Sequence, residues 1–171
     1  AFAGAVMMAA GAATGFSLAI PGALLFAWAV GRNLVAWWRA YGRKLGAGET
    51  APLLIATVGL LLLLVAGLAH GAGWLVARSA LAAYVALFLL PLVTGALAQL
   101  LPVWRFPGAD TPARTAMQRR LIGAGRLRAL LFFIAGLAFL FDVPFAGVPA
   151  ALALADFVLR LMVALYNPRQ P

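Results

Sequence analysis

The sequence contains no cysteine, only four acidic residues and a single histidine. The absence of cysteine excludes disulfides, thiolate metal sites and covalent haem attachment through a cysteine motif. The lone histidine has no thiol, glutamate or second histidine that would complete a metal site. The chain also lacks a nucleophile paired with a base and a phosphate-binding glycine loop. We therefore expect no metal ion and no autonomous catalytic activity.

Charge of either sign is scarce. Charged residues make up 10% of the chain and hydrophobic residues 65%, which leaves too little polar surface to cover a soluble globule of this length. The formal net charge of +9 would suggest nucleic acid in a soluble protein, but here the cations flank long apolar segments. We expect anionic lipid headgroups as the counter-charge and no nucleic-acid partner.

The apolar residues are gathered into five long segments. A bilayer core about 30 Å thick needs roughly 20 apolar residues in helical form, and the five segments meet or approach that length. They run over about residues 5–30, 53–76, 80–104, 127–141 and 145–166, and Pro21-Gly22 interrupts the first. The predicted fold is all-α, a single polytopic domain of five transmembrane helices.

The cations predict the orientation of these helices. Eleven of the thirteen lysines and arginines lie in the connectors after the first and third segments or after the fifth segment. The other two connectors contain only Arg78 and only Asp142. The positive-inside rule then places the N-terminus outside and the C-terminus inside.

The Ala-, Gly-, Pro- and Arg-rich composition is typical of a GC-rich bacterium, so we expect a multi-pass protein of the bacterial inner membrane. Because Ala1 is not a methionine, we expect a processed chain or a piece of a longer one.

The two basic connectors are the predicted lipid contacts. The pattern Asp110-Thr111-Pro112 is typical of a helix start, with a capping residue before a first-turn proline, and it predicts an interfacial helix over residues 112–123. The cations expected to contact anionic lipid are Arg39, Arg43, Lys44, Arg114, Arg119 and Arg120.

Asp156 and Arg160 lie inside the fifth predicted span. An ionisable side chain there costs on the order of 2.5 to 3.5 kcal/mol on insertion scales. Their spacing of four residues puts both on one helical face. Either the pair is a proton relay or a docking contact for another helix or subunit, or it is a self-contained ion pair with Arg160 reaching towards the inner headgroups. In both cases this face is expected to point at protein or water.

His70 and two glycine pairs are the remaining candidates. The imidazole of His70 suits a haem ligand or a quinone contact, and equally an interhelical hydrogen bond near the outer face. No other cofactor is predicted. Gly11 with Gly15, and Gly67 with Gly71, match the GxxxG pattern that permits close packing of helices.

Residues 89–104, LLPLVTGALAQLLPVW, form a small-residue turn followed by Gln-Leu-Leu-Pro. This stretch resembles a helix ending in polytopic bacterial membrane proteins of the NnrS and haem-copper-oxidase subunit I group. Those families hold haem or copper through histidines on several helices, whereas this chain has only His70, on a different span, so no ligand role carries over. The resemblance implies a respiratory or otherwise energy-transducing setting.

Three functions remain open at this point. The first is a non-catalytic subunit or accessory protein of a larger membrane complex, favoured by the absence of catalytic groups and by the small-residue helix faces. The second is a transporter or channel, whole or half, with Asp156 and Arg160 on a proton or solute path. The third is a haem- or quinone-binding protein that uses His70.

Overall fold

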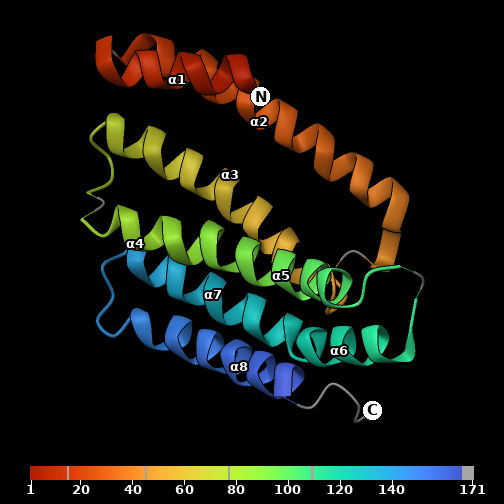
Figure 1. Cartoon of the computed structure of the whole chain (residues 1–171). Coiled ribbons are helices and arrows are strands. Elements are labelled where there is room, and N and C mark those ends of the chain that lie inside the picture. The colour runs from red at the N-terminus through yellow and green to blue at the C-terminus, as the bar shows by residue number, and fades with distance from the viewer. Residues whose placement is uncertain (15, 45, 77, 109, 167–171) are drawn as a thin grey trace.

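The computed structural model describes residues 1–14, 16–44, 46–76, 78–108 and 110–166, and within these ranges it contains helices and loops but no strand. Five continuous helical stretches are long and apolar enough to cross a membrane, and they run over Leu18–Tyr41, Ala51–Gly71, Ala80–Arg105, Pro112–Leu140 and Gly147–Tyr166. This confirms the predicted all-α fold with five candidate spans (Figure 1). The elements are α1 (Phe2–Thr14), α2 (Phe16–Tyr41), the 3-10 turn η1 (Gly42–Lys44), α3 (Ala51–Gly71), α4 (Ala80–Tyr84), the π-helical turn η2 (Val85–Leu89), α5 (Leu90–Arg105), α6 (Pro112–Ile122), α7 (Gly125–Leu140) and α8 (Gly147–Tyr166).

The first predicted span, residues 5–30, is wrong as a single helix. The chain instead forms two helices, α1 and α2, and Pro21 lies inside the continuous α2. A single helix over residues 2–41 would measure about 60 Å at 1.5 Å per residue, roughly twice the bilayer core. The two helices pack along one another (Figure 1). A Cβ at Gly11 would overlap the backbone of Ala19, and one at Gly22 would lie 2.7 Å from the amide nitrogen of Met8.

The fourth predicted segment and the predicted helix over residues 112–123 correspond to α7 and α6. The cap forms as the sequence indicates, since the Thr111 side chain accepts a hydrogen bond from the amide of Arg114 at 3.3 Å. The apolar face of α6 is covered by protein, because Met117 and Leu121 are buried with Phe157 of α8 in one core cluster. The helix α6 therefore packs on α5 and α8.

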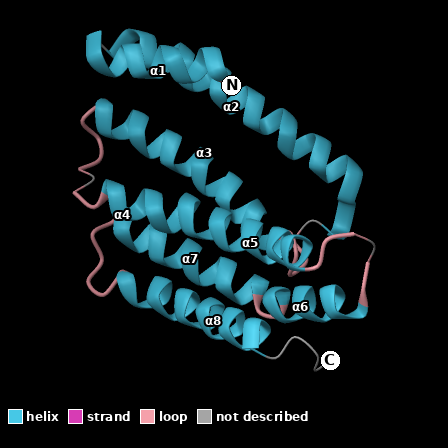
Figure 2. Ribbon diagram, in the orientation of Figure 1, coloured by secondary structure: helices cyan, strands magenta, loops and turns pink. Residues whose placement is uncertain are grey.

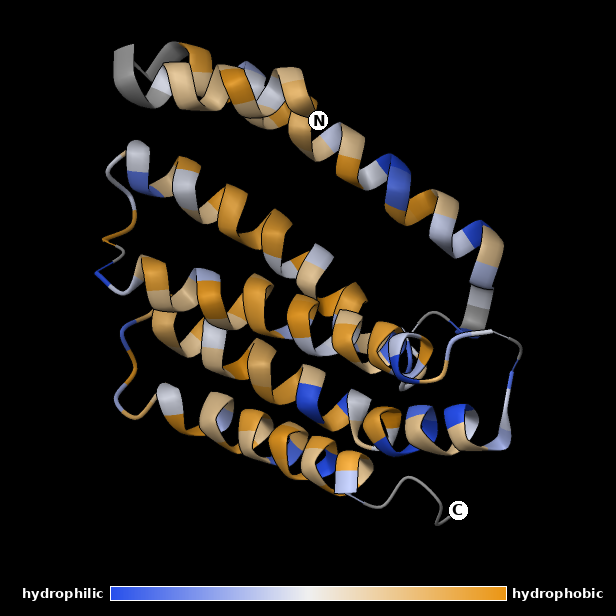
Figure 3. Cartoon of the chain, in the orientation of Figure 1, coloured by the Kyte–Doolittle hydropathy of each residue, from blue (hydrophilic) through white to orange (hydrophobic). Residues whose placement is uncertain are grey.

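The connectors lie at two opposite ends of the bundle (Figure 2). Ser79 Oγ donates a hydrogen bond to Asp142 Oδ1 at 2.8 Å, which joins the two connectors that are poor in cations. At the other end Arg126 Nε donates to the carbonyl of Gly46 at 2.9 Å, which joins the two basic connectors. Hydrophilic residues gather mainly towards this second end (Figure 3). The consecutive candidate spans therefore alternate in direction within the bundle.

Leu87 in η2 is the point where three helices meet. Its side chain is fully buried. A Cβ at Gly59 of α3 would overlap the carbonyl oxygen of Leu87, and one at Gly136 of α7 would overlap its side chain. Pro91 follows this turn and has no N–H, so the carbonyl of Leu87 lacks the bond that residue 91 would donate in a regular helix. The two glycines thus let α3 and α7 approach η2 closely. The regular hydrogen bonding of η2 is interrupted by Pro91.

Single-cysteine variants test the orientation cleanly, because the chain has no cysteine of its own. We expect Trp74→Cys, at an exposed position after α3, to react with a membrane-impermeant maleimide in intact cells. Arg119→Cys, at an exposed position in α6, is the matched variant and should react only after permeabilisation. Labelling of both positions from the same side would contradict the alternating arrangement, and a reversed pattern would contradict the orientation.

Gly59→Ala and Gly67→Ala test the helix packing on one helix. Alanine is favoured over glycine in a helix by about 1 kcal/mol, and a Cβ at Gly67 meets no atom within 4 Å, so Gly67→Ala should keep or raise the unfolding temperature in detergent. At Gly59 the methyl group meets the Leu87 backbone, and overpacking of this kind costs about 1 to 3 kcal/mol. Gly59→Ala should therefore unfold several degrees lower. Equal unfolding temperatures for the two variants would show that Gly59 is not at a tight contact.

Candidate functional site

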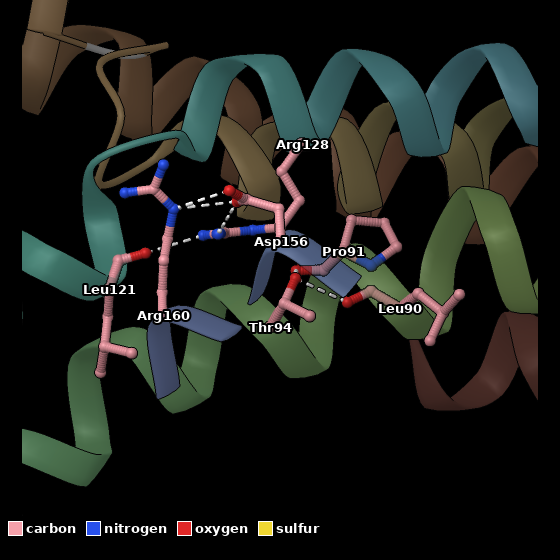
Figure 4. Close-up of polar contacts among 7 residues, drawn as sticks. All are labelled: Leu90, Pro91, Thr94, Leu121, Arg128, Asp156 and Arg160. Carbon is pink, nitrogen blue, oxygen red and sulfur yellow. Dashed lines mark hydrogen bonds and ion pairs between the residues drawn. The ribbon is translucent and has the colours of Figure 1, made fainter. Parts of the chain in front are cut away.

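Asp156 on α8 is bound by two arginines of its own chain (Figure 4). Arg160, one turn later on α8, places Nε 2.8 Å from Asp156 Oδ1 and 3.0 Å from Oδ2. Arg128, in the first turns of α7, places Nη1 3.4 Å from Asp156 Oδ2. We call these three residues the Asp156 network. It joins α7 to α8 through one carboxylate.

Arg128 is the most buried charged side chain described, with 1% of its surface exposed. Its Nη2 donates to the carbonyl of Leu121 at 2.9 Å, in the last turn of α6, where carbonyls have no partner within the helix. Its guanidinium carbon lies 4.8 Å from the ring centroid of Phe157, in the range of a cation–π contact. Its Nε is buried without a hydrogen-bond partner among the described residues. Arg128 thus ties the end of α6 to α8.

The turn between α6 and α7 is shaped by glycine. An ideal Cβ at Gly123 would lie 2.8 Å from Arg160 Nη1, and one at Gly125 would overlap the carbonyl of Gly48 in the first basic connector. The absence of side chains at these positions lets the Arg160 guanidinium and the first connector lie against the turn. A substitution at Gly123 would displace the Arg160 guanidinium, and one at Gly125 would displace the first connector from the turn.

Two guanidinium groups and one carboxylate leave the Asp156 network with a net charge of +1. The side chains of Asp156 and Arg160 are each 35% exposed, whereas that of Arg128 is 1% exposed. Isolated charges are costly inside a membrane bundle and pair with one another where they occur. The geometry therefore compensates the buried arginine and leaves Asp156 and Arg160 equally exposed.

Arg128 is one of the cations counted in the second basic connector, but it lies in α7. The structure buries its side chain in the bundle, while Arg126, two residues earlier, is exposed and bonds to Gly46. Residues two apart on a helix point to nearly opposite sides, so one of the two arginines at the start of a core helix has to face inward. The spacing predicts that the two side chains point to different sides, but it does not identify Asp156 as the partner of Arg128.

His70 lies at the exposed end of α3, and its Nδ1 donates to the carbonyl of Leu75 at 2.8 Å. This bond ties the imidazole to the following loop of the same chain. No group of three or more metal-ligating side chains occurs among the described residues. The hydrogen bond is therefore local and not the interhelical one that was the alternative to a haem or quinone role.

The predicted lipid-binding cations are distributed around the basic end of the bundle. Arg39, Lys44 and Arg119 are exposed and Arg120 is half-buried, while the side chain of Arg43 lies outside the described part. Arg114 forms an ion pair with Asp110 at 3.1 Å and donates to the carbonyl of Gly108 at 3.2 Å. Its charge is therefore partly compensated by its own connector.

The predicted glycine pairs have different surroundings. Gly11 lies at the close contact between α1 and α2, and Gly15 is outside the described residues. Gly67 meets no atom of the chain, and Gly71 is exposed at the end of α3. Within the chain itself, Gly59 and Gly136 have the packing role that the pattern had suggested for Gly67 and Gly71.

Comparisons with protein-family models, with curated proteins and with solved structures gave no match to this chain. The Asp156 network and the surfaces of the helices are therefore the features that bear on function.

Asp156→Asn and Arg160→Gln should destabilise the protein to different degrees. Asp156→Asn removes the charge that compensates Arg128 and leaves that guanidinium buried, so we expect a loss of about 3 kcal/mol in the free energy of unfolding. Arg160→Gln removes a partly exposed partner and should cost about 1 kcal/mol or less. Unfolding by SDS in mixed micelles measures the free energy of unfolding of each variant.

The matched control is Asp142→Asn, which removes the same charge from an exposed acid in the connector after α7 and should leave the unfolding curve close to that of the parent. A loss for Asp156→Asn no larger than for Asp142→Asn would mean that the Asp156 network does not hold the helices together.

Proposed function

We propose that this chain is a non-catalytic integral membrane subunit or accessory protein of a larger membrane complex. The observation that carries the proposal is the position of the α1–α2 hairpin. Its two helices pack against each other at backbone contact, but the hairpin joins the remaining helices mainly through α3. It lies at one edge of the structure (Figure 1). A hairpin attached in this way offers most of its surface to a neighbour.

The outward surfaces of the hairpin and of α8 are apolar. Leu24 and Trp28 of α2 are 64% and 63% exposed, and Leu159 of α8 is 67% exposed. Such faces need lipid or the helices of another protein to cover them. The only acid within the spans, Asp156, is meanwhile engaged by Arg128 and Arg160. Apolar outer faces combined with an internally compensated charge favour a packing role over a chemical one.

We place the complex in the bacterial inner membrane, in a respiratory or otherwise energy-transducing assembly. The support for this setting is the similarity of residues 89–104 to a helix ending of the NnrS and haem-copper-oxidase subunit I group. The proposed partners are other membrane subunits and anionic lipid. No cofactor of the chain's own is part of the proposal.

A transporter or channel is the second candidate, and one observation favours it. The Asp156 side chain keeps 35% of its surface exposed despite its two arginine partners, so a proton or solute could reach it. In that case Asp156→Asn would abolish solute-driven flux in proteoliposomes at a protein level equal to that of the parent.

The third candidate is a haem-binding protein. A haem at His70 would be visible in the absorption spectrum of the purified protein.

A photo-crosslinking amino acid at the position of Leu24 tests the subunit proposal. We expect it to form a protein–protein adduct in intact membranes, because this exposed face of α2 would contact another subunit. The matched variant carries the same group at Arg78, an exposed residue in the connector after α3, and should give weaker adducts. The complex purified in mild detergent should contain the same partner. A chain that is monomeric in mild detergent and forms no adduct at Leu24 would contradict the proposal.

A further inference from the structure

One face of α2 combines two arginines, an aromatic ring and small residues. A groove of about 550 Å³ lies along this face and is lined by Trp28, Gly31, Arg32, Val35, Ala36 and Arg39. The guanidinium carbon of Arg32 lies 4.9 Å from the ring centroid of Trp28. A Cβ at Gly31 would meet no atom within 4 Å, so the floor of the groove is open.

The two arginines of this groove have no acidic partner in the described structure. The ion pairs there join Arg114 to Asp110, and Arg128 and Arg160 to Asp156. Arg39 lies two residues before Tyr41, in the stretch of exposed aromatic residues expected at headgroup level. Arg32 is seven residues earlier, about 10 Å further along the helix at 1.5 Å per residue. Its charge is contacted by the Trp28 ring but by no acidic group of the described structure, so an anion drawn below the ordinary headgroup level would stabilise it.

A second groove adjoins the first and has a different character. It has a volume of about 390 Å³, lies between α2 and α3, and is lined by Leu34, Val35, Trp38, Arg39 and Leu54. Val35 and Arg39 line both grooves. A site with uncompensated cations on one side and an apolar channel on the other fits an amphiphile with an anionic head.

We propose that α2 and the start of α3 form a specific site for an anionic glycerophospholipid. The phosphate lies beside Arg39, whose guanidinium donates hydrogen bonds to it, and Arg32 turns from the Trp28 ring towards Arg39 to donate as well. One acyl chain lies in the groove between Leu34 and Leu54. The site shares Trp28 with the surface assigned to a partner subunit, but it requires only this chain and a lipid.

Native mass spectrometry of the full chain in detergent tests the site, with phosphatidylglycerol and phosphatidylcholine as the added lipids. Each arginine near the membrane surface contributes about fivefold to anionic-lipid affinity. The variant Arg32→Gln/Arg39→Gln should therefore lose on the order of twentyfold in affinity for phosphatidylglycerol, with phosphatidylcholine binding unchanged. Arg78→Gln/Arg105→Gln removes the same charge from exposed positions outside the groove and should retain the preference. Equal losses in the two double variants would overturn the site and indicate diffuse attraction.

Gly31→Leu tests the same site without a change in charge. The open space at Gly31 accepts a larger side chain without a clash, and leucine is the better helix former, so the variant should fold. It should block the groove and lower phosphatidylglycerol binding, and unaltered binding would overturn the proposal.

Competition by soluble glycerol phosphate at the same concentration as the lipid would show that the apolar groove is unused. A protein that co-purifies with the parent but not with Arg32→Gln/Arg39→Gln, without bound lipid, would assign this face to a partner subunit instead.

Discussion

The carboxylate of Asp156 is shared between a buried arginine from α7 and a half-buried one from α8, and the basic end of the bundle is arranged around this contact. Arg128 could not remain inside the bundle without the carboxylate, because an uncompensated charge is costly there. Through its second bond, to Leu121, Arg128 also fixes the end of α6. One acid therefore determines how three helices meet.

Away from the charges, the bundle is held by contact between backbones. Gly59 and Gly136 bring α3 and α7 against Leu87, while Gly11 and Gly22 bring α1 against α2. Helices in a bilayer gain little hydrophobic free energy from association, so close approach and van der Waals contact have to supply it. The bundle thus consists of a core fixed by glycines and by the Asp156 network, with the less connected α1–α2 hairpin at its edge. Because the hairpin has fewer contacts with the rest of the chain than the core helices have with one another, we propose that it binds other molecules. One part of its surface contacts protein and another part contacts lipid.

Local patterns in the sequence predicted local features well. The apolar runs predicted the helices, Asp110-Thr111-Pro112 predicted the start of α6, and the four-residue spacing predicted the contact of Asp156 with Arg160. Features that depend on distant residues were missed. Arg128 lies 28 residues before Asp156, and its position among the basic residues of a connector concealed its role. The hairpin was missed because Pro21 is the more obvious break in the sequence, whereas α2 continues through it.

The coupling energy between Arg128 and Asp156 measures how far the meeting of the three helices depends on this shared carboxylate. Unfolding free energies of Arg128→Met, Asp156→Leu and the double variant form a double-mutant cycle, and residues in one ionic network commonly show coupling of about 0.5 to 3 kcal/mol. We expect a value in the upper half of this range, with the double variant more stable than Asp156→Leu alone, because the buried charge left without a partner is then removed as well. Additive effects, with the double variant less stable than either single one, would contradict the account.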